Sequence, residues 1–234
     1  DLIRLARPAL RNSNPLYQGN GMLTVHHLGK SQSERIVWLC EELGIPYELK
    51  LYARDPVTRL GPPEYKALHP LGTAPIITDG NLVLAESTAI MEYIMTKYGN
   101  GGLVPATTDP TFADYLYWFH FANGSLQPNL GRSMILGRVD LPADNPLLKW
   151  VTGRLDLAMG LVEKRLGEKD YLAGDVFTAA DIVTVFSLTT MRLFLPMDIS
   201  PFANILAYLQ RIGAREGYRR AMQKGDPDLT PMLS

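Results

Sequence analysis

In the first part of the chain the spacing of apolar residues changes from that of a strand to that of a helix and back. Residues 23–26 have the composition of a short strand, and residues 46–51 alternate as a second strand. Between them, four apolar positions recur at helical spacing before Gly44, a residue typical of a helix C-terminus: Ile36, Leu39, Cys40 and Leu43. The order strand, helix, strand predicts a right-handed parallel βαβ unit.

The next ordered pattern combines a proline, a hairpin and a helix start. Ala74-Pro75 precedes a short apolar run, and Asp79-Gly80 separates it from a second β-type run at 82–84. We predict a hairpin with Asp79 and Gly80 at the centre of its turn, both with positive φ. Glu86-Ser87 then opens a helix. A helix N-terminus beside a proline turn is suited to hold a small anion or a peptide.

Beyond these elements the pattern is helical. Asp109, Asn145 and Ser200 each precede a proline, which predicts three helices with that proline at the first position. Residues 178–181, Thr-Ala-Ala-Asp, resemble a capping box, and the helix that follows is apolar nearly all round, so it should be central. The predicted fold class is therefore α/β plus all-α, with an α/β domain over 22–100, a linker over 101–108 and an all-helical domain over 109–234.

Composition narrows the classes of function. The chain has 234 residues, 46% of them hydrophobic and 20% charged, as in an ordinary soluble protein of one or two domains. A net charge of −1 argues against nucleic-acid binding driven by bulk electrostatics, and no apolar run is long enough to span a membrane. A single cysteine excludes an internal disulfide, and the four histidines are too scattered to predict a metal site. These features fit a cytoplasmic protein.

Residues 1–21 differ from the rest of the chain. They begin without Met, and Met22 stands just before the first predicted strand. We interpret them as a disordered or vector-derived leader. Arg4, Arg7 and Arg11 among apolar residues leave a targeting peptide as the alternative.

Four segments, in order and at matching spacing, resemble the cytosolic glutathione transferase family, in particular its hydroxyl-type, serine-like bacterial and fungal members. They are 27–36, 68–75, 85–87 and 174–181, and the resemblance extends over residues 22–218. It implies a thioredoxin-like domain followed by a helical bundle. It also implies a two-fold homodimer, a role such as detoxification, and glutathione as co-substrate without a metal or redox cofactor.

By this resemblance, Ser31 donates a hydrogen bond to the sulfur of glutathione and favours the thiolate. A thiol with a pKa of about 8.5 is only about 3% ionised at pH 7, whereas a pKa of about 6.5 makes it roughly 75% ionised. That change requires about 2.7 kcal/mol, within reach of one charge-assisted hydrogen bond (roughly 1.5–3) and a helix N-terminus (about 0.3–1). Lys30 is the second candidate for this role, because some classes of the family place the reactive residue at that position. The residues alone allow Ser31 or Ser33 to be only a helix cap.

The resemblance also assigns the tripeptide site. A cis Ala74-Pro75 bond would offer backbone groups for β-type pairing with glutathione, and Thr73 would stand at its glycine end. Glu86 would pair with the ammonium of the γ-glutamyl group, while Ser87 and the first helical N–H groups bind its carboxylate. Without the resemblance, these residues would be a strand-starting proline and a capped helix start.

Two further interpretations concern the thiol acceptor and the cysteine. Tyr115, Trp118 and Phe119 are candidates to line an apolar acceptor pocket, although an aromatic stripe at this spacing is also typical of a core. Cys40 falls on the apolar helix face, where an inert buried thiol is expected. Disulfide exchange through a protein thiol is therefore disfavoured.

The first hypothesis is an enzyme that adds the glutathione thiolate to small hydrophobic electrophiles. One alternative is a glutathione-dependent peroxidase or thiol reductase. Another is a non-catalytic interaction or ligand-carrier module with the same fold.

Overall fold

The computed structural model describes residues 22–234, so the interpretation of 1–21 lies outside the described residues. Its chain begins with strand β1 (Thr24–Leu28), helix α1 (Glu34–Leu43) and strand β2 (Glu48–Tyr52). β1 and β2 pair in parallel, with Thr24 opposite Glu48, and Gly44 ends α1 with a φ of 63°. The parallel pairing predicted from the alternating periods is confirmed.

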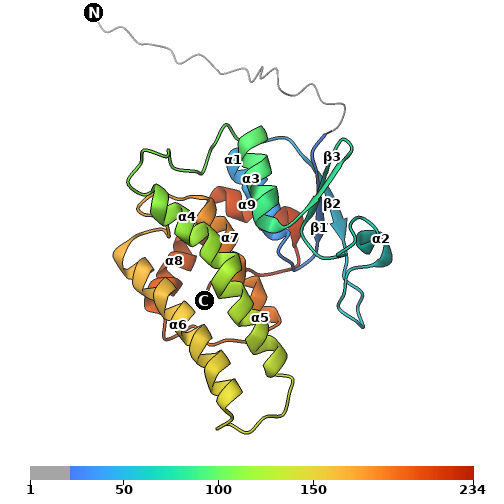
Figure 1. Cartoon of the computed structure of the whole chain (residues 1–234). Coiled ribbons are helices and arrows are strands. Elements are labelled where there is room, and N and C mark those ends of the chain that lie inside the picture. The colour runs from blue at the N-terminus through green and yellow to red at the C-terminus, as the bar shows by residue number, and fades with distance from the viewer. Residues whose placement is uncertain (1–21) are drawn as a thin grey trace, which may run out of the picture.

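A short helix, α2 (Pro63–Lys66), precedes the predicted hairpin, whose strands are β3 (Ile76–Asp79) and β4 (Leu82–Ala85). Helix α3 (Ser87–Lys97) follows directly. The sheet order is β2-β1-β3-β4, with β3 antiparallel to both of its neighbours. Figure 1 shows α1 and α3 beside the sheet on one side and α2 away from them.

The hairpin exists, but its turn lies one residue later than predicted. Asp79 pairs with Leu82, so the central residues are Gly80 and Asn81, and of these only Gly80 has a positive φ, at 59°. Asp79 instead ends β3 and accepts hydrogen bonds from Tyr93 and Lys97 of α3. A glycine at the first central position suits a tight hairpin turn, because only that residue needs the left-handed region.

Residues 98–234 contain helices and turns and no strand. The helical part runs in the order α4 (Phe112–Phe121), π-helical η2 (Ala122–Leu126), α5 (Gln127–Leu136), α6 (Pro146–Glu168), α7 (Ala179–Leu188), 3₁₀-helical η3 (Thr190–Leu193), α8 (Ala203–Gly213) and α9 (Glu216–Gly225). Figure 1 shows most of these helices gathered on one side of the α/β part, with α9 reaching back toward α1. The two-part fold is confirmed.

Only one of the three proline helix starts is where we predicted it. Asn145 caps α6, and its side chain accepts the Leu147 N–H at 2.9 Å. The other two helices begin after the predicted proline, because the polar residues there close turns. Asp109 accepts the Thr111 N–H, and Ser200 donates its N–H to Asp198. The predicted capping box is present, with both reciprocal hydrogen bonds between Thr178 and Asp181, and every residue of α7 is buried.

One hydrophobic core joins the two parts of the fold. It runs from β1 and α1 through α3 and α4 to α7, α8 and α9. A smaller cluster covers the other face of the sheet beneath α2: Leu28, Tyr52, Tyr65, Ile76 and Ala85. Cys40 is fully buried, and burial raises the pKa of its thiol, as expected for an inert cysteine. Leu28 at the end of β1 belongs to the smaller cluster and Ile36 of α1 to the larger one, so the elements on both sides of the β1–α1 loop are anchored by packing.

None of the helices within residues 22–234 combines the length and apolar character needed to cross a membrane.

Candidate active site

A cavity of about 620 Å³ brings together the segments in which the sequence placed candidate residues. Lys30 and Ser31 of the β1–α1 loop line it, as do Thr73 and Ala74 of the proline turn and Glu86 before α3. The helical part completes the wall with Asn123, Gln127, Pro128, Gly131, Met134, Phe186, Met191 and Phe194. The cavity is polar where it meets the loop and α3 and apolar toward α7 and η3.

Ser31 lies at the cavity surface with 5% of its area exposed. Its Oγ accepts the Ser33 N–H at 3.2 Å and lies 2.8 Å from Ser33 Oγ. Ser33 precedes α1, yet its side chain makes no capping hydrogen bond, because its Oγ turns back to β1 and accepts the Leu28 N–H. The capping alternative therefore does not describe Ser33.

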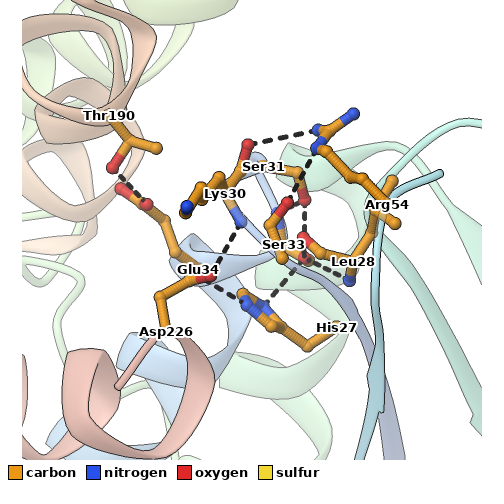
Figure 2. Close-up of polar contacts among 10 residues, drawn as sticks. His27, Leu28, Lys30, Ser31, Ser33, Glu34, Arg54, Thr190 and Asp226 are labelled. Atoms are coloured by element: carbon orange, nitrogen blue, oxygen red, sulfur yellow. Dashed lines mark hydrogen bonds and ion pairs between the residues drawn. The ribbon is translucent and has the colours of Figure 1, made fainter. Parts of the chain in front are cut away.

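Lys30 is fixed through its backbone. It adopts a left-handed φ of 54°, and its N–H donates to Asp226 Oδ1 at 2.8 Å. Arg54 donates to the carbonyl oxygens of Gly29 and Lys30 at 2.8 and 3.1 Å. Figure 2 shows the Arg54 guanidinium directed toward this loop. Arg54 after β2 and Asp226 after α9 thus both bond the Gly29–Lys30 peptide unit, and Arg54 also bonds the next one, which sets the path of the loop into Ser31.

The predicted cis peptide bond between Ala74 and Pro75 is present. Thr73 and Ala74 face the cavity, whereas the Pro75 side chain is buried below the turn. The turn leads straight into β3, an inner strand of the sheet, so its backbone is placed beside the β1–α1 loop.

At the start of α3, Glu86 and Ser87 differ in position. Glu86 is exposed on the cavity wall in a left-handed conformation, with a φ of 72°. Ser87 is buried, and its Oγ accepts hydrogen bonds from Asn123 Nδ2 at 2.8 Å and Arg35 Nη1 at 3.3 Å. A hydroxyl with both acceptor positions filled can only donate to a further partner.

Arg35 is a part of the site that the sequence did not reveal. It is fully buried under the cavity wall, and its guanidinium donates to the amide oxygens of Gln32, Asn123 and Gln127. Burial lowers the pKa of Arg35 to about 9, so it remains a cation at neutral pH. Its hydrogen-bond partners within residues 22–234 include no carboxylate, and this region therefore attracts an anion.

The acceptor-pocket interpretation of Tyr115, Trp118 and Phe119 is wrong. Their side chains are 3%, 6% and 1% exposed, belong to the core, and do not line the cavity. The face of α4 that carries them packs toward α7, as an aromatic stripe at helical spacing most often does. The apolar wall comes instead from Met134, Phe186, Met191 and Phe194, which no local pattern marks as lining a cavity.

The site carries no grouping for a metal ion: the described part of the chain has no cluster of three or more suitable His, Cys, Asp or Glu side chains. The polar groups near the cavity are hydroxyls, amides and single charges.

Comparison with known proteins identifies the fold and the family. The glutathione S-transferase N-terminal domain family matches residues 31–97, and the C-terminal domain family matches residues 140–216. Glutathione S-transferase 3 of Schizosaccharomyces pombe is 32% identical over 230 residues, which cover 91% of this chain and 92% of that protein.

Two solved structures share the fold of this chain. A glutathione S-transferase from Actinobacillus pleuropneumoniae is 34% identical, with a TM-score of 0.80 over 88% of this chain and 93% of that one. A glutathione transferase from Burkholderia graminis, with two glutathione molecules bound per subunit, has the same fold at 24% identity, with a TM-score of 0.69 over 90% of this chain and 92% of that one. The chain belongs to the glutathione S-transferase family.

Proposed function

We propose that the protein conjugates reduced glutathione to small hydrophobic electrophiles and that Ser31 stabilises the reacting thiolate. The observation that carries this proposal is the meeting of three distant segments on one cavity: Ser31, Ala74 at its cis peptide bond, and Glu86. The bound glutathione in the Burkholderia graminis transferase supports the choice of ligand.

The tripeptide lies with its γ-glutamyl end at the start of α3. Glu86 pairs with the ammonium, and the carboxylate binds the first N–H groups of α3 beside the Ser87 hydroxyl. Asn123 and Arg35 occupy both acceptor positions of that hydroxyl, so its proton is left for an anionic ligand. The nearby Arg35 cation adds to the attraction.

The cysteinyl sulfur then lies next to Ser31, at the opening of α1. A hydrogen bond from a hydroxyl to a thiolate and the positive end of a helix both favour the ionised thiol. The electrophile occupies the apolar side formed by Met134, Phe186 and Phe194. Catalysis consists of raising the fraction of thiolate and holding it near its acceptor.

We further infer that the protein acts as a homodimer in the cytoplasm, in a role such as detoxification. The support for a dimer is apolar surface: Leu82 and Val83 on β4 and Tyr117 on α4 are between 37% and 52% exposed. The absence of a metal or redox cofactor follows from the proposed chemistry, in which glutathione is the only co-substrate.

Replacing Ser31 by alanine should lower kcat/KM for glutathione by about ten- to a hundredfold, because one charge-assisted hydrogen bond to the thiolate is lost. The affinity for S-methylglutathione, which cannot form a thiolate, should change little. Lys30→Met should leave most of the rate. If Ser31→Ala and the double variant both conjugate at the parental rate, the assignment of this loop is wrong.

Glu86→Gln should weaken glutathione binding by about tenfold, since the γ-glutamyl ammonium loses its anionic partner. Calorimetry at neutral pH measures this directly. Glu92→Gln removes an exposed carboxylate from α3, the helix that Glu86 precedes, and should bind glutathione like the parent. Equal affinities for the two variants would place the ammonium elsewhere, and no binding by the parent at millimolar glutathione would favour a carrier or interaction module.

A further inference from the structure

An unbroken line of hydrogen bonds leads from the end of α9 to Ser31. Asp226 Oδ2 is 3.0 Å from His27 Nε2, and His27 Nδ1 is 2.9 Å from Ser33 Oγ. Ser33 Oγ is in turn 2.8 Å from Ser31 Oγ, as Figure 2 shows. His27 and Ser33 are at most 1% exposed, so Ser33 cannot meet a substrate. Of these four residues, Ser31 alone lines the 620 Å³ cavity.

Two backbone donors restrict how protons can be arranged along this line. The Leu28 N–H occupies one acceptor position of Ser33 Oγ, and the Ser33 N–H occupies one acceptor position of Ser31 Oγ. Each hydroxyl therefore has one acceptor position and one proton left. The protonation state of His27 decides in which direction the two hydroxyls donate their hydrogen bonds.

When His27 is an imidazolium beside the Asp226 carboxylate, its Nδ1–H donates to Ser33 Oγ. The Leu28 N–H and the His27 Nδ1–H then fill both acceptor positions of Ser33, so Ser33 cannot accept from Ser31. The Ser33 proton turns to Ser31 Oγ at 2.8 Å or to the Leu28 carbonyl oxygen at 3.3 Å. The Ser31 proton has no acceptor left within the line and points into the cavity, where a thiolate would receive it.

When His27 is neutral, its one ring proton stays on Nε2, where Asp226 accepts it, and Nδ1 becomes an acceptor. Ser33 donates to Nδ1, and its free acceptor position takes the Ser31 proton, which now points away from the cavity. We propose that His27 and Asp226 are positioning residues: through Ser33, the protonated imidazole directs the Ser31 hydroxyl toward the glutathione sulfur. This inference rests on the proposed role of Ser31.

The surroundings of His27 contain other charges that any test must separate. Asp226 pairs with it, Lys30 and Arg54 belong to or hold the loop that follows it, and the Glu34 carboxyl on α1, which points toward Thr190, is near enough to Asp226 to interact with its charge. Burial raises the pKa of Glu34 to about 8, and the Asp226 charge adds to the effect. His27 and Asp226 also border a second cavity, of about 540 Å³, which Ser31 does not line, so His27 can exchange protons without passing through the glutathione site.

The test follows the His27 ring by ¹⁵N NMR, with its signals assigned by their loss in His27→Phe. Saturating glutathione is compared with S-methylglutathione, which makes the same tripeptide contacts without a thiolate. We expect the imidazolium of His27 to hold its proton about tenfold more tightly or better in the glutathione complex. Identical titrations in the two complexes would overturn the inference.

Ser33→Ala separates the relay from direct attraction between the thiolate and the imidazolium. It removes the connecting hydroxyl and leaves Ser31. The difference in His27 proton affinity between the glutathione and S-methylglutathione complexes should then vanish, whereas direct attraction would preserve it. Glu34→Gln is the matched control: it removes the nearby carboxyl whose pKa burial raises to about 8, and the difference in His27 proton affinity between the two complexes should remain. A difference that persists in Ser33→Ala, or that is lost in Glu34→Gln, contradicts the relay.

Asp226→Asn provides a test that does not depend on Ser33→Ala folding. The Lys30 N–H fixes the amide oxygen at the position of Oδ1, so the amide NH₂ faces His27 Nε2. The neutral ring should therefore change from the Nε2–H tautomer of the parent to the Nδ1–H tautomer, which NMR distinguishes. An unchanged tautomer would overturn the arrangement. Loss of conjugation in Ser31→Ala without these His27 signatures would refute the relay alone, whereas parental conjugation in Ser31→Ala would refute the proposed role of Ser31 on which the relay rests.

Discussion

Replacing Asp181 by alanine should lower the free energy of unfolding by about 4 kcal/mol. The carboxylate is fully buried at the start of α7 and accepts hydrogen bonds from the Leu172 N–H at 3.0 Å, the Thr178 N–H at 2.9 Å and the Tyr208 hydroxyl at 3.0 Å. The Thr178 hydroxyl also donates to this carboxylate, at 3.3 Å. The alanine variant leaves these buried donors without their acceptor, and each unsatisfied donor costs roughly 1–3 kcal/mol. Urea denaturation followed by circular dichroism measures the loss.

Asp175→Ala is the matched control for this prediction. Asp175 lies six residues earlier and pairs with Lys169 at 2.9 Å, but its side chain is 66% exposed. Exposed ion pairs contribute about 0–1 kcal/mol, so this variant should unfold almost like the parent. If both variants lose the same stability, the Asp181 hydrogen bonds are not what holds α7 to its neighbours.

The elements that could be predicted from the sequence are those specified by residues close together in the chain. The capping box at 178–181 needs only four residues, and the Gly44 stop and the Asn145 cap need fewer. The cis bond at Ala74-Pro75 is different, because few bonds before proline are cis, and its prediction came from the family resemblance.

Errors arose where one residue type has two local uses. Asp79 is as suitable for the last position of a strand as for a turn. Its carboxylate accepts hydrogen bonds from residues of α3, the helix that follows the hairpin. Asp109 and Ser200 are polar residues before proline, yet they close turns instead of capping helices. Tyr115, Trp118 and Phe119 could face either a core or a pocket, and periodicity alone does not distinguish the two.

The parts of the site that no pattern revealed are contacts between distant residues. Arg35 of α1 meets Asn123 of η2 and Gln127 of α5, which lie 88 and 92 positions later in the sequence. His27 meets Asp226 across 199 positions of sequence. The sequence shows a histidine at the end of a strand and an aspartate after a helix, and only the packing of α9 on α1 brings them together.

Glu34→Gln should remove a pH dependence of stability from the protein. The Glu34 carboxyl is buried, accepts a hydrogen bond from the Thr190 hydroxyl at 2.6 Å, and has its pKa raised by burial from 4.5 to about 8. Between these two values the folded state holds a proton that the unfolded chain has released. The parent's free energy of unfolding should therefore fall as pH rises through this window, by up to about 5 kcal/mol in total, and level off above it.

The measurement compares urea unfolding of the parent and Glu34→Gln at pH 5 and pH 8. Asp181, whose pKa burial raises to about 6, titrates in the same direction but is common to both proteins, so it cancels in their difference. The glutamine variant should gain stability relative to the parent as pH rises, because an amide keeps an acceptor for Thr190 and has no proton to lose. Glu92→Gln, on the exposed face of α3, should follow the parent at both pH values. A constant difference between the parent and Glu34→Gln would mean that the Glu34 carboxyl is already ionised at pH 5, with Arg35 as the nearest cation able to compensate it.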